Sequence, residues 1–453
     1  MWTWGLLGAY TLVLLLIGWR GRRRLHDTAE AFFLADRQLS AWVAAGSLLA
    51  SWFGAASTIA TYEDALQHGF SAFGWIGLPT VLTVLILAMA APWIRSLPTV
   101  STPDLLAMRY GTVYGHFVRG VLVAYMVGLA ASQAVALGLL LRDWTGMGYT
   151  AGVLCGLAIV VTYAAVGGYL SVVITDWLQW LLILGFLGLL WGIAWPVRTH
   201  VAHPVPTSPG ELVRSTHLWS TLSFTIAWSI SPIGWQRIAS VRDPRHVRTM
   251  MVIVAGVFLI AYLLVVLPGA WWGGTHPGTH RLGTVLRISL SQPVFALAML
   301  ALTAAVMSTL DAALNTGVYM IAALIRIRRR AFGYALATLA LAVCTGWIAL
   351  AHRNIIRALG LSSEILVVTI AVPIVLLRWP KWTHPWGAWA CTFVGAGIAA
   401  AEYIGGTRLP PALQWPHGIP WGLTLSGICY AVGTWLGRRY HRPAGVDSPT
   451  VTQ

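Results

Sequence analysis

The sequence predicts an all-α polytopic membrane protein with about thirteen transmembrane helices. Of its 453 residues 57% are hydrophobic and only 9% are charged, and the mean hydropathy is +0.72. A soluble domain carries about a quarter charged residues. Uncharged runs of roughly 20 residues recur along the chain, each long enough to cross a ~30 Å hydrocarbon core as a helix. The basic residues cluster in alternate short loops, as the positive-inside rule requires.

The first apolar run is expected to be a retained transmembrane span. A cleaved signal peptide has its positive charges before the apolar run, whereas here Arg20, Arg22, Arg23 and Arg24 follow it. This order predicts an N-terminus outside the cell. The thirteen expected spans cover 2–19, 41–61, 73–94, 120–141, 150–167, 172–196, 217–235, 250–272, 292–325, 332–351, 361–377, 385–404 and 418–437.

The charge distribution predicts the orientation in the membrane. With the N-terminus outside, the inner segments hold 21 of the 29 lysines and arginines, and eight remain outside. The net charge of +15 therefore reflects topology in an inner cell membrane, with a cytoplasmic C-terminus, and not nucleic-acid binding. Neither the Pro-rich outer loop 197–216 nor the tail after Arg442, which we expect to be disordered, is long enough for a folded domain.

Two of the spans contain residues that interrupt a helix. The second span is rich in Gly, Ala and Ser and ends at Glu63 and Asp64, and the seventh carries Pro232 and Gly234 near its middle. Proline removes a helical hydrogen bond and frees carbonyl groups at membrane depth. Broken helices in corresponding positions of two halves are the best sequence indication of a transporter's binding site.

These interruptions divide the chain into two inverted five-helix repeats, each with a broken first helix. The expected parts are an N-terminal extra helix and inner loop (1–40), repeat one (41–196), an outer loop (197–216), repeat two (217–378), and two C-terminal helices with a short tail (379–453).

The stretch VMSTLDAALN at 306–315 places four polar side chains, Ser308, Thr309, Asp311 and Asn315, inside an apolar run. Hydroxyls in membrane helices often bond to carbonyls of their own helix or to a neighbouring helix. Positions 305, 308 and 309 also share one helical face, as oxygens around an ion would. The stretch alone leaves both interpretations open.

Five motifs in order resemble those of the sodium:solute symporter family. They are FFLADRQLSAW (32–42), SLLASWFGAASTIATYEDALQHG (47–69), AAVGGYLSVVITDWLQ (164–179), SPIGWQRIASVRDPRHVR (231–248) and AAVMSTLDAALN (304–315). The resemblance implies a leucine-transporter-like inverted-repeat fold, commonly with thirteen helices in bacterial members, and transport of a small solute with sodium.

The resemblance also implies an ion site between the second and ninth spans. Its oxygens would be the backbone carbonyls of Ala50, Phe53 and Ala305 and the hydroxyls of Ser308 and Thr309. Asp176 would lie on the inward path of the ion, or alternatively would cap the start of the sixth span. For Asp311 we expect pairing with an arginine of the inner loops, or a role in shaping the ion exit.

Candidates for the substrate cavity follow from the same fold. They are Ser57, Trp75, Gln133, Phe224, Trp228, Pro232 and Gln236. Sugar-transporting relatives use a glutamate where this chain has aromatic and small residues, in FSAFGWIG at 70–77. The expected solute is therefore small and amphipathic, for example an amino acid or a carboxylate.

The sequence thus predicts a sodium-coupled symporter that imports a small organic solute by alternating access. The alternatives are a proton-coupled or uncoupled transporter of the same fold, and a transporter-like membrane sensor. We expect sodium, the solute and membrane lipid as partners, sodium as the only metal, and no cofactor or enzymatic activity, because no nucleophile, base or metal constellation converges. The four cysteines are expected to pack, and Glu364 and Glu402 to lie at the membrane interface without an assigned role.

Overall fold

The computed structural model describes residues 2–22, 29–97, 102–200, 215–325, 330–405 and 408–440, and these residues are almost entirely helical. Within these ranges the β-structure is a single bridge between Leu39 and Val241. The long helices are α1 (Trp2–Arg22), α3 (Ala41–Trp52), α5 (Leu78–Ser96), α7 (Thr112–Thr145), α8 (Tyr149–Ala194), α10 (Ser215–Ser229), α12 (Val247–Thr275), α14 (Gln292–Ile325), α15 (Arg330–Ala351), α16 (Ile355–Leu376), α17 (Pro385–Gly405) and α18 (Ile419–Tyr440). Shorter helices are α2 (Ala29–Leu34), the π-helical turns η2 (Ala56–Ala60) and η4 (Phe73–Gly77), α4 (Thr61–His68), α6 (Thr102–Tyr110), α11 (Pro232–Ser240) and α13 (Leu282–Ser289).

Each of the thirteen expected spans overlaps a helix or part of one. In the described ranges, nine helices are long and apolar enough to cross a membrane, or ten if the bent pair of 41–52 and 56–71 forms one span. The chain is therefore an integral membrane protein, while the count of thirteen stays a prediction. The fifth and sixth expected spans form one helix, α8, which bends at Gly168, where φ is 61°.

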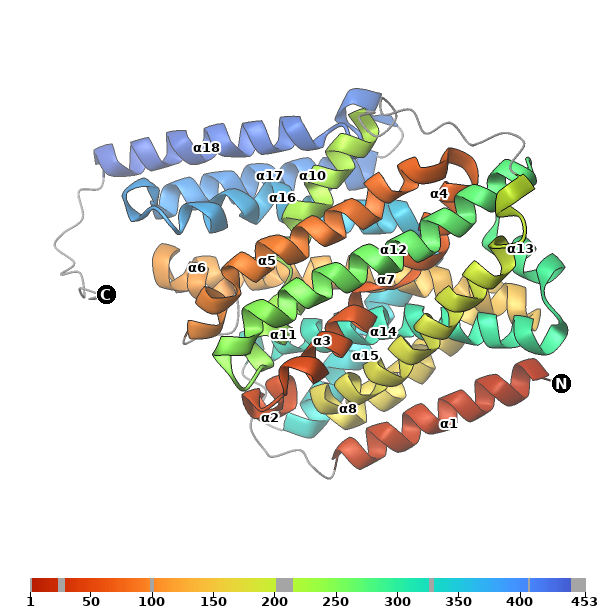
Figure 1. Ribbon diagram of the computed structural model, residues 1–453. Coiled ribbons are helices and arrows are strands. Elements are labelled where there is room, and N and C mark those ends of the chain that lie inside the picture. The colour runs from red at the N-terminus through yellow and green to blue at the C-terminus, as the bar shows by residue number, and fades with distance from the viewer. Residues whose placement is uncertain are drawn as a thin grey trace.

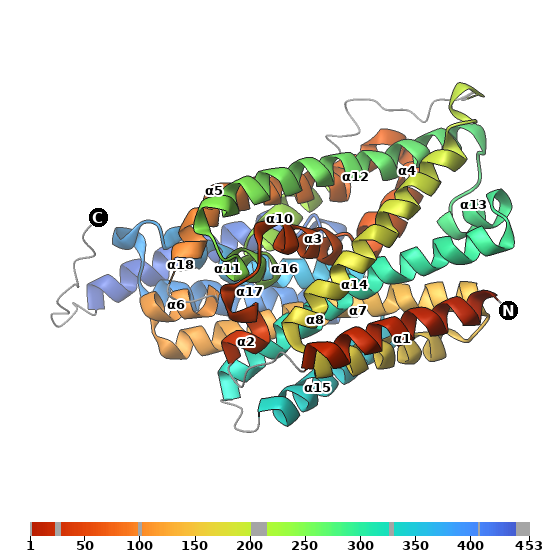
Figure 2. The same cartoon turned by 60° about the horizontal axis from the view of Figure 1, so that its bottom comes forward.

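The helices form two groups that pack side by side (Figures 1 and 2). One group contains α3, α4, α5, α10, α11 and α12, and in it α5 runs along α12. The other contains α7, α8, α14 and α15, with α14 packed along α7 and α8. Helix α16 contacts both groups, α17 and α18 pack against each other at one edge, and α1 packs on α8.

Both predicted helix breaks are present. Helix α3 ends at Trp52, and the helical segment that follows Gly54 and Ala55 is bent by 66° from it. Helix α10 ends at Ser229, and Ser231 has extended backbone angles (φ −64°, ψ 130°) before Pro232 starts α11. Proline suits the first helical position because its missing N–H would have no intrahelical partner there.

The segments before α3 and after α11 are joined by backbone hydrogen bonds. The amide of Leu39 donates to the carbonyl of Ser240 (3.1 Å), and the amide of Arg242 donates to the carbonyl of Leu39 (2.8 Å). The guanidinium Nε of Arg95 on α5 donates to the carbonyl of Val241 (2.8 Å). The two broken helices are therefore tied together at this end of the molecule.

The loop 197–216 lies mostly, and the tail after Arg442 entirely, outside the described residues, so those two expectations stay predictions.

Candidate functional site

The hydroxyl of Ser308 lies between two backbone carbonyls from different helices. Its Oγ is 2.8 Å from the carbonyl oxygen of Ala50, in the last turn of α3, and 2.8 Å from that of Ala305, one turn earlier on α14. A hydroxyl has one proton and two lone pairs, so it can donate to one carbonyl at a time and keeps accepting capacity. Three oxygens therefore converge where α14 meets the end of α3.

Thr309 and Phe53 adjoin this cluster. The Thr309 hydroxyl is buried and has no hydrogen-bond partner among the residues that the structure describes. Phe53 is fully buried and follows α3 with non-helical angles (φ −101°, ψ 54°), which ends the carbonyl ladder of that helix. Gly54 lies so close that a Cβ there would collide with the Thr309 Oγ1. The five residues predicted to bind the ion are thus all buried at this junction.

The junction supplies neutral oxygens. Carbonyl groups at a helix break and nearby hydroxyls are the ligands that transporters with discontinuous helices use for sodium. A buried hydroxyl without a partner costs free energy of about 1–3 kcal/mol, which an ion ligated by it would recover. We name Ala50, Phe53, Ala305, Ser308 and Thr309 the helix-break cluster.

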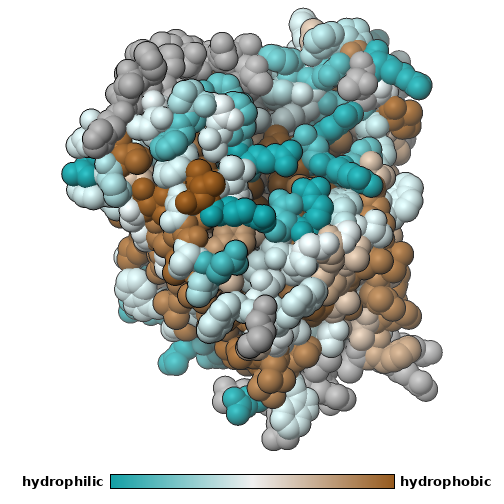
Figure 3. All heavy atoms as spheres, turned by 90° about the vertical axis from the view of Figure 1, so that its right-hand side faces the viewer, coloured by the Kyte–Doolittle hydropathy of each residue, from teal (hydrophilic) through white to brown (hydrophobic). Residues whose placement is uncertain are grey.

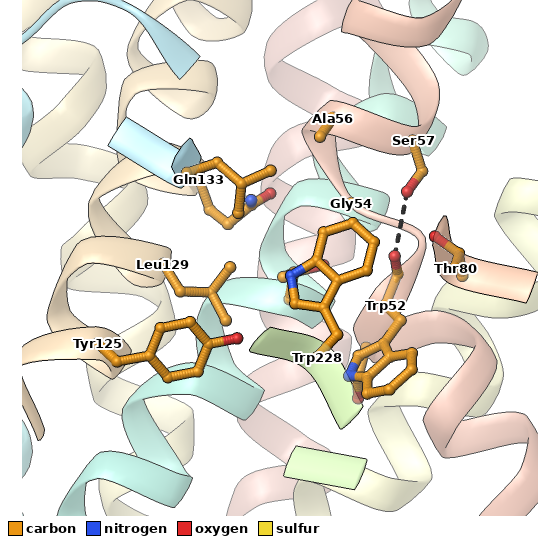
Figure 4. A pocket seen from close by; sticks show the side chains of 12 residues that line it. Trp52, Gly54, Ala56, Ser57, Thr80, Tyr125, Leu129, Gln133 and Trp228 are labelled. Atoms are coloured by element: carbon orange, nitrogen blue, oxygen red, sulfur yellow. Dashed lines mark hydrogen bonds between the residues drawn. The ribbon is translucent and has the colours of Figure 1, made fainter. Parts of the chain in front are cut away.

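A small cavity adjoins the helix-break cluster (Figure 4). Its volume is about 40 Å³, room for no more than a few water molecules. The residues around it come from α3, η2, η4–α5, α7, α10, α14 and α16. They are Ser51, Trp52, Gly54, Ala56, Ser57, Thr80, Tyr125, Leu129, Gln133, Trp228, Thr309 and Leu359. We call it the central cavity; no ionisable acid or base other than Tyr125 lines it.

Three of the seven substrate candidates line the central cavity: Ser57, Gln133 and Trp228. Phe224 lies behind Trp228 and stacks on it, with ring centroids 4.9 Å apart. Trp75 belongs to η4 and does not line the cavity, and neither does the buried Pro232 at the start of α11.

Gln236 also lies away from the central cavity. Its Nε2 donates to the carbonyl of Phe33 (2.7 Å), and its Oε1 accepts from the hydroxyl of Thr316 (2.9 Å). It therefore joins α11 to α2 and α14 as a structural contact. Tyr125 and Leu129 of the cavity were not predicted, although they lie eight and four positions before Gln133 on α7 and share its helical face.

Polar contacts hold the break of the first repeat in place. The Gln133 Oε1 accepts from the backbone amide of Ala55 (3.0 Å). The Ser57 hydroxyl donates to the carbonyl of Trp52 (3.1 Å, the dashed line in Figure 4) and is 2.7 Å from the Tyr262 hydroxyl. Tyr262 in turn lies 2.9 Å from the Thr80 hydroxyl. The freed Ala55 amide is thus bonded by α7, and the freed Trp52 carbonyl by Ser57, whose hydroxyl is held by α12.

Asp176 lies inside α8 and not at a helix start. Its Oδ2 accepts from the hydroxyls of Ser47 (2.5 Å) and Ser51 (3.2 Å) on α3 and is 3.6 Å from the Arg237 Nη2. Asp176 and Arg237 are fully buried. The capping interpretation is therefore wrong, because Thr175 donates to carbonyls within its own helix and Asp176 faces α3 and α11.

Asp311 has a different direct partner from the expected arginine. Its Oδ2 accepts a 2.5 Å hydrogen bond from the Tyr163 hydroxyl of α8. Like Asp176 it is fully buried, and its other oxygen has no hydrogen-bond partner within the described part of the chain. The expectation of a pair with an inner-loop arginine is wrong, because α14 turns this side chain toward α8.

Glu364 and Glu402 are enclosed by protein and do not face water, while their depth in the membrane stays a prediction. Their side chains are 1% and 5% exposed, and the Glu402 Oε1 accepts from the backbone amide of Trp415. Both were placed at the interface because sequence reasoning assigns isolated carboxylates to water. Here α16 and α17 enclose them.

The chain has detectable relatives in sequence. A model of the sodium:solute symporter family matches residues 32–395. An osmoregulated proline transporter of Bacillus subtilis is 24% identical over 285 residues, which cover 58% of this chain and 57% of that protein. A sodium/proline symporter of Staphylococcus aureus strain JH9 is 25% identical over 191 residues, 40% of this chain and 37% of that protein. The chain thus matches about half or less of the length of these relatives.

Solved structures share the fold. That of a Na⁺-coupled sialic acid symporter, described as a substrate-bound outward-open state, has a TM-score of 0.81 at 16% identity and covers 98% of this chain and 99% of that one. A transporter of the nucleobase-cation-symport-1 family has a TM-score of 0.54 at 15% identity, and the match covers 92% of this chain and 96% of that one. The chain therefore has a leucine-transporter-like fold.

Proposed function

The chain belongs to the sodium:solute symporter family, and from that premise we propose that it is a symporter that moves a small organic solute across a cell membrane with sodium. The observation that carries this proposal is the helix-break cluster, where the Ser308 hydroxyl and two carbonyls converge beside the Thr309 hydroxyl, which has no partner. The resemblance of the sequence motifs to those of the family implies ion binding by these same five residues.

Sodium at the helix-break cluster would couple the two helix groups. Ala50 lies in α3 of the first group and Phe53 follows that helix, whereas Ala305, Ser308 and Thr309 belong to α14 in the second. An ion that is ligated from both groups stabilises the arrangement in which they are closest. Binding of sodium therefore shifts the population toward that arrangement, which is the thermodynamic content of coupling.

The two ends of the molecule support an outward-facing assignment. Leu39, Ser240 and Arg242 close one end with backbone hydrogen bonds. At the other end, which also carries the start of α1, a wide cavity opens (Figure 3). With the N-terminus outside, the wide cavity faces the exterior, and alternating access would open the Leu39–Val241 contact. The division into repeats at 41–196 and 217–378 is part of this proposal.

The central cavity supports a small solute. Its lining combines the aromatic rings of Trp52 and Trp228, with centroids 6.5 Å apart, with the amide of Gln133 and hydroxyls. Aromatic faces and a few polar groups suit a compact amphipathic molecule, such as an amino acid or a carboxylate. At about 40 Å³ the cavity is smaller than such a solute, so binding requires Trp52 or Trp228 to move.

One observation favours proton coupling as a second candidate. Asp176 and Asp311 are both fully buried; the buried Arg237 lies 3.6 Å from Asp176, while Asp311 is bonded to the neutral Tyr163 hydroxyl. Isolated buried carboxylates are costly in the charged form, so such a cluster has a reason to hold a proton. Proton coupling would give uptake that follows a pH gradient without sodium.

The first experiment compares the thermal midpoint of the purified protein in sodium, potassium and choline chloride. Selective binding to the folded state raises the midpoint through mass action. A rise specific for sodium supports the proposal. If the midpoint is the same in the three salts, and a pH gradient drives uptake into proteoliposomes in choline, the proton-coupled candidate replaces it.

A further inference from the structure

The wide cavity at the open end is lined by an unusual number of arginines. Its volume is about 760 Å³, and it lies on the face formed by α13 and the ends of α4, α7, α14 and α16, where hydrophilic side chains gather (Figure 3). We call it the outer vestibule. Its ionisable lining residues are Glu63, Arg142, Asp143, Arg281, Arg287 and Arg353.

The outer vestibule is lined by several of the helices that line the central cavity. Four elements line both spaces. Each of them contributes to the vestibule residues that lie closer to the open end of the molecule than those it contributes to the central cavity. On α7, Gln133 lines the central cavity and Ala136 the vestibule; on α16, the corresponding residues are Leu359 and Ile355. The η2–α4 segment and α14 repeat this pattern with Ser57 and Ile59, and with Thr309 and Leu302. A solute that enters from this face must therefore pass the arginines.

The two carboxylates of the vestibule are engaged. The Asp143 carboxylate accepts from the adjacent Arg142 (2.8 Å), and the Glu63 Oε1 accepts from the backbone amide of Leu282 (3.1 Å). In the part of the chain that the structure describes, no carboxylate lies within 4.0 Å of the other three guanidinium groups, those of Arg281, Arg287 and Arg353. The vestibule therefore has a net positive charge.

All three of these arginines are exposed; Arg287 and Arg353 have neutral neighbours, and Arg281 lies within electrostatic reach of Glu63. The Arg287 Nη2 donates to the backbone carbonyl of Asp143 (2.9 Å) and lies 5.5 Å from the Phe295 ring centroid. Arg353 lies 4.9 Å from the ring centroid of Tyr149. These contacts orient the guanidinium groups without neutralising them.

The position of these charges opposes the orientation rule for membrane proteins. With the N-terminus outside, eight basic residues are expected on the outer side, and four of these line the vestibule. Positive charge at outer span ends works against the positive-inside preference. A concentration of arginine at one outer cavity therefore needs a reason other than topology.

We infer that the outer vestibule gathers small organic anions, so that the transported solute is a carboxylate with net negative charge and not a zwitterion. The apolar walls, which include Leu139, Leu140 and Met299, lower the local dielectric and strengthen the field of the arginines. The planar guanidinium fork matches a carboxylate in two parallel hydrogen bonds. Because the central cavity has no charged side chain, charge selection takes place at the vestibule. This inference rests on the proposed function.

A cysteine probe measures the potential of the vestibule without knowledge of the solute. Cys155, Cys344, Cys391 and Cys429 are replaced by alanine, and Ile356 at the vestibule wall is replaced by cysteine. The rates of modification by anionic methanethiosulfonate ethylsulfonate and cationic methanethiosulfonate ethyltrimethylammonium are compared with those for a free thiol. The anionic reagent should be favoured by about tenfold or more.

The ratio of the anionic to the cationic modification rate, each relative to the free thiol, should fall to near one in the triple variant Arg281→Gln/Arg287→Gln/Arg353→Gln. Arg408→Gln is the control, because Arg408 is an exposed arginine that neither lines the vestibule nor neighbours position 356 in the sequence. The control should keep the preference. A normalised ratio at or below one in the parent protein overturns the inference.

The solute class is tested with matched pairs of probes at constant ionic strength. Lactate and succinate are compared with lactamide and succinamide, and with L-proline, as ligands that raise the thermal midpoint in saturating sodium. Only the carboxylates should raise the midpoint. In the triple variant their apparent affinity should fall about tenfold, and by more at low ionic strength. An equal effect of L-proline or the amides, or no effect of any carboxylate, overturns the inference.

The same measurement in choline separates this inference from the proposed function. If carboxylates stabilise the protein equally in choline and in sodium, the proposal of sodium coupling is wrong and the inference about the vestibule is retained. If sodium stabilises the protein but neutral or zwitterionic solutes are preferred, the inference about the vestibule is wrong and the proposal of sodium coupling is retained.

Discussion

The hydroxyl of Ser308 and the carbonyl of Ala50 are 2.8 Å apart across a sequence separation of 258 residues. This contact joins the middle of α14 to the last turn of α3, immediately before the chain breaks at Phe53 to Ala55. Helix α3 of the first group packs on α11 and α12 and also on α8, and α14 packs along α7 and α8. An ion at this point would therefore respond to the relative position of the two groups.

Removal of the two hydroxyls should abolish the response to sodium. In Ser308→Ala/Thr309→Ala the cluster loses two oxygens, while the carbonyls of Ala50 and Ala305 remain. Wild-type protein should gain about 2.7 kcal/mol at a sodium concentration one hundred times the dissociation constant, and the variant should gain none. The thermal midpoint in sodium and in choline measures the difference.

Thr303→Ala is the matched control for this variant. Thr303 is a buried threonine on the same helix, and its hydroxyl donates to the carbonyl of Met299 (2.8 Å), away from the cluster. It should keep the full sodium response. A retained response in Ser308→Ala/Thr309→Ala would contradict the assignment of the ion site.

Gly54→Ala should damage the site by sterics alone. A Cβ at this position would meet the Thr309 Oγ1 and the Gln133 Oε1, which belong to the second helix group. Overpacking of a tight junction costs about 1–3 kcal/mol, and the sodium response should weaken at the same time. Gly120 on α7 has open space around it, so Gly120→Ala should keep the sodium response and leave the midpoint equal to that of the wild type or slightly higher, because alanine favours the helix over glycine.

Loss of Arg237 should destabilise the fold through the buried carboxylate that it faces. In Arg237→Met the charge of Asp176 stays buried without its partner, which costs about 3–5 kcal/mol. The double variant Arg237→Met/Asp176→Asn should recover a large part of that loss, since no unpaired charge remains at this position. A double-mutant cycle on thermal midpoints measures the coupling, and additive losses would show that the pair does not interact.

Weakening the closed end should expose the segments before α3 and after α11. Arg95→Gln removes the guanidinium that bonds to the carbonyls of Val241 (2.8 Å) and Arg242 (3.4 Å). Hydrogen exchange at the amides of Leu39 and Arg242 should become faster, by an amount that reports the lost closing free energy.

Arg109→Gln serves as the comparison for the closed end. Arg109 also bonds to neighbouring groups, Thr383 and the carbonyl of Pro380, but it lies away from the Leu39–Val241 contact. Exchange at Leu39 should stay slow in this variant. Equal acceleration in both variants would assign the effect to general loosening of the protein.

The sequence predicted the helices well because membrane helices are local. Apolar runs of sufficient length form helices whatever their neighbours, since lipid cannot satisfy the backbone. Pro232 and the Gly, Ala and Ser content of the second span indicated both breaks for the same local reason, and the motifs at 47–69 and 304–315 identified the residues of the helix-break cluster by resemblance. Gln236 and Phe224 were assigned to the cavity because the sequence cannot show which way a side chain turns in a crowded bundle.

By itself, the sequence determined that this is an integral membrane protein of broken helices and a member of its family, because hydrophobic length, helix breakers and ordered motifs are properties of short segments. Only the tertiary structure decided the partners of its buried charges. Asp176 meets Arg237, Asp311 meets Tyr163, and Glu402 meets the backbone of Trp415, through packing between helices far apart in the chain. It also decided that arginines from three separate outer segments line one vestibule, because the field of a cavity depends on where its charges meet in space.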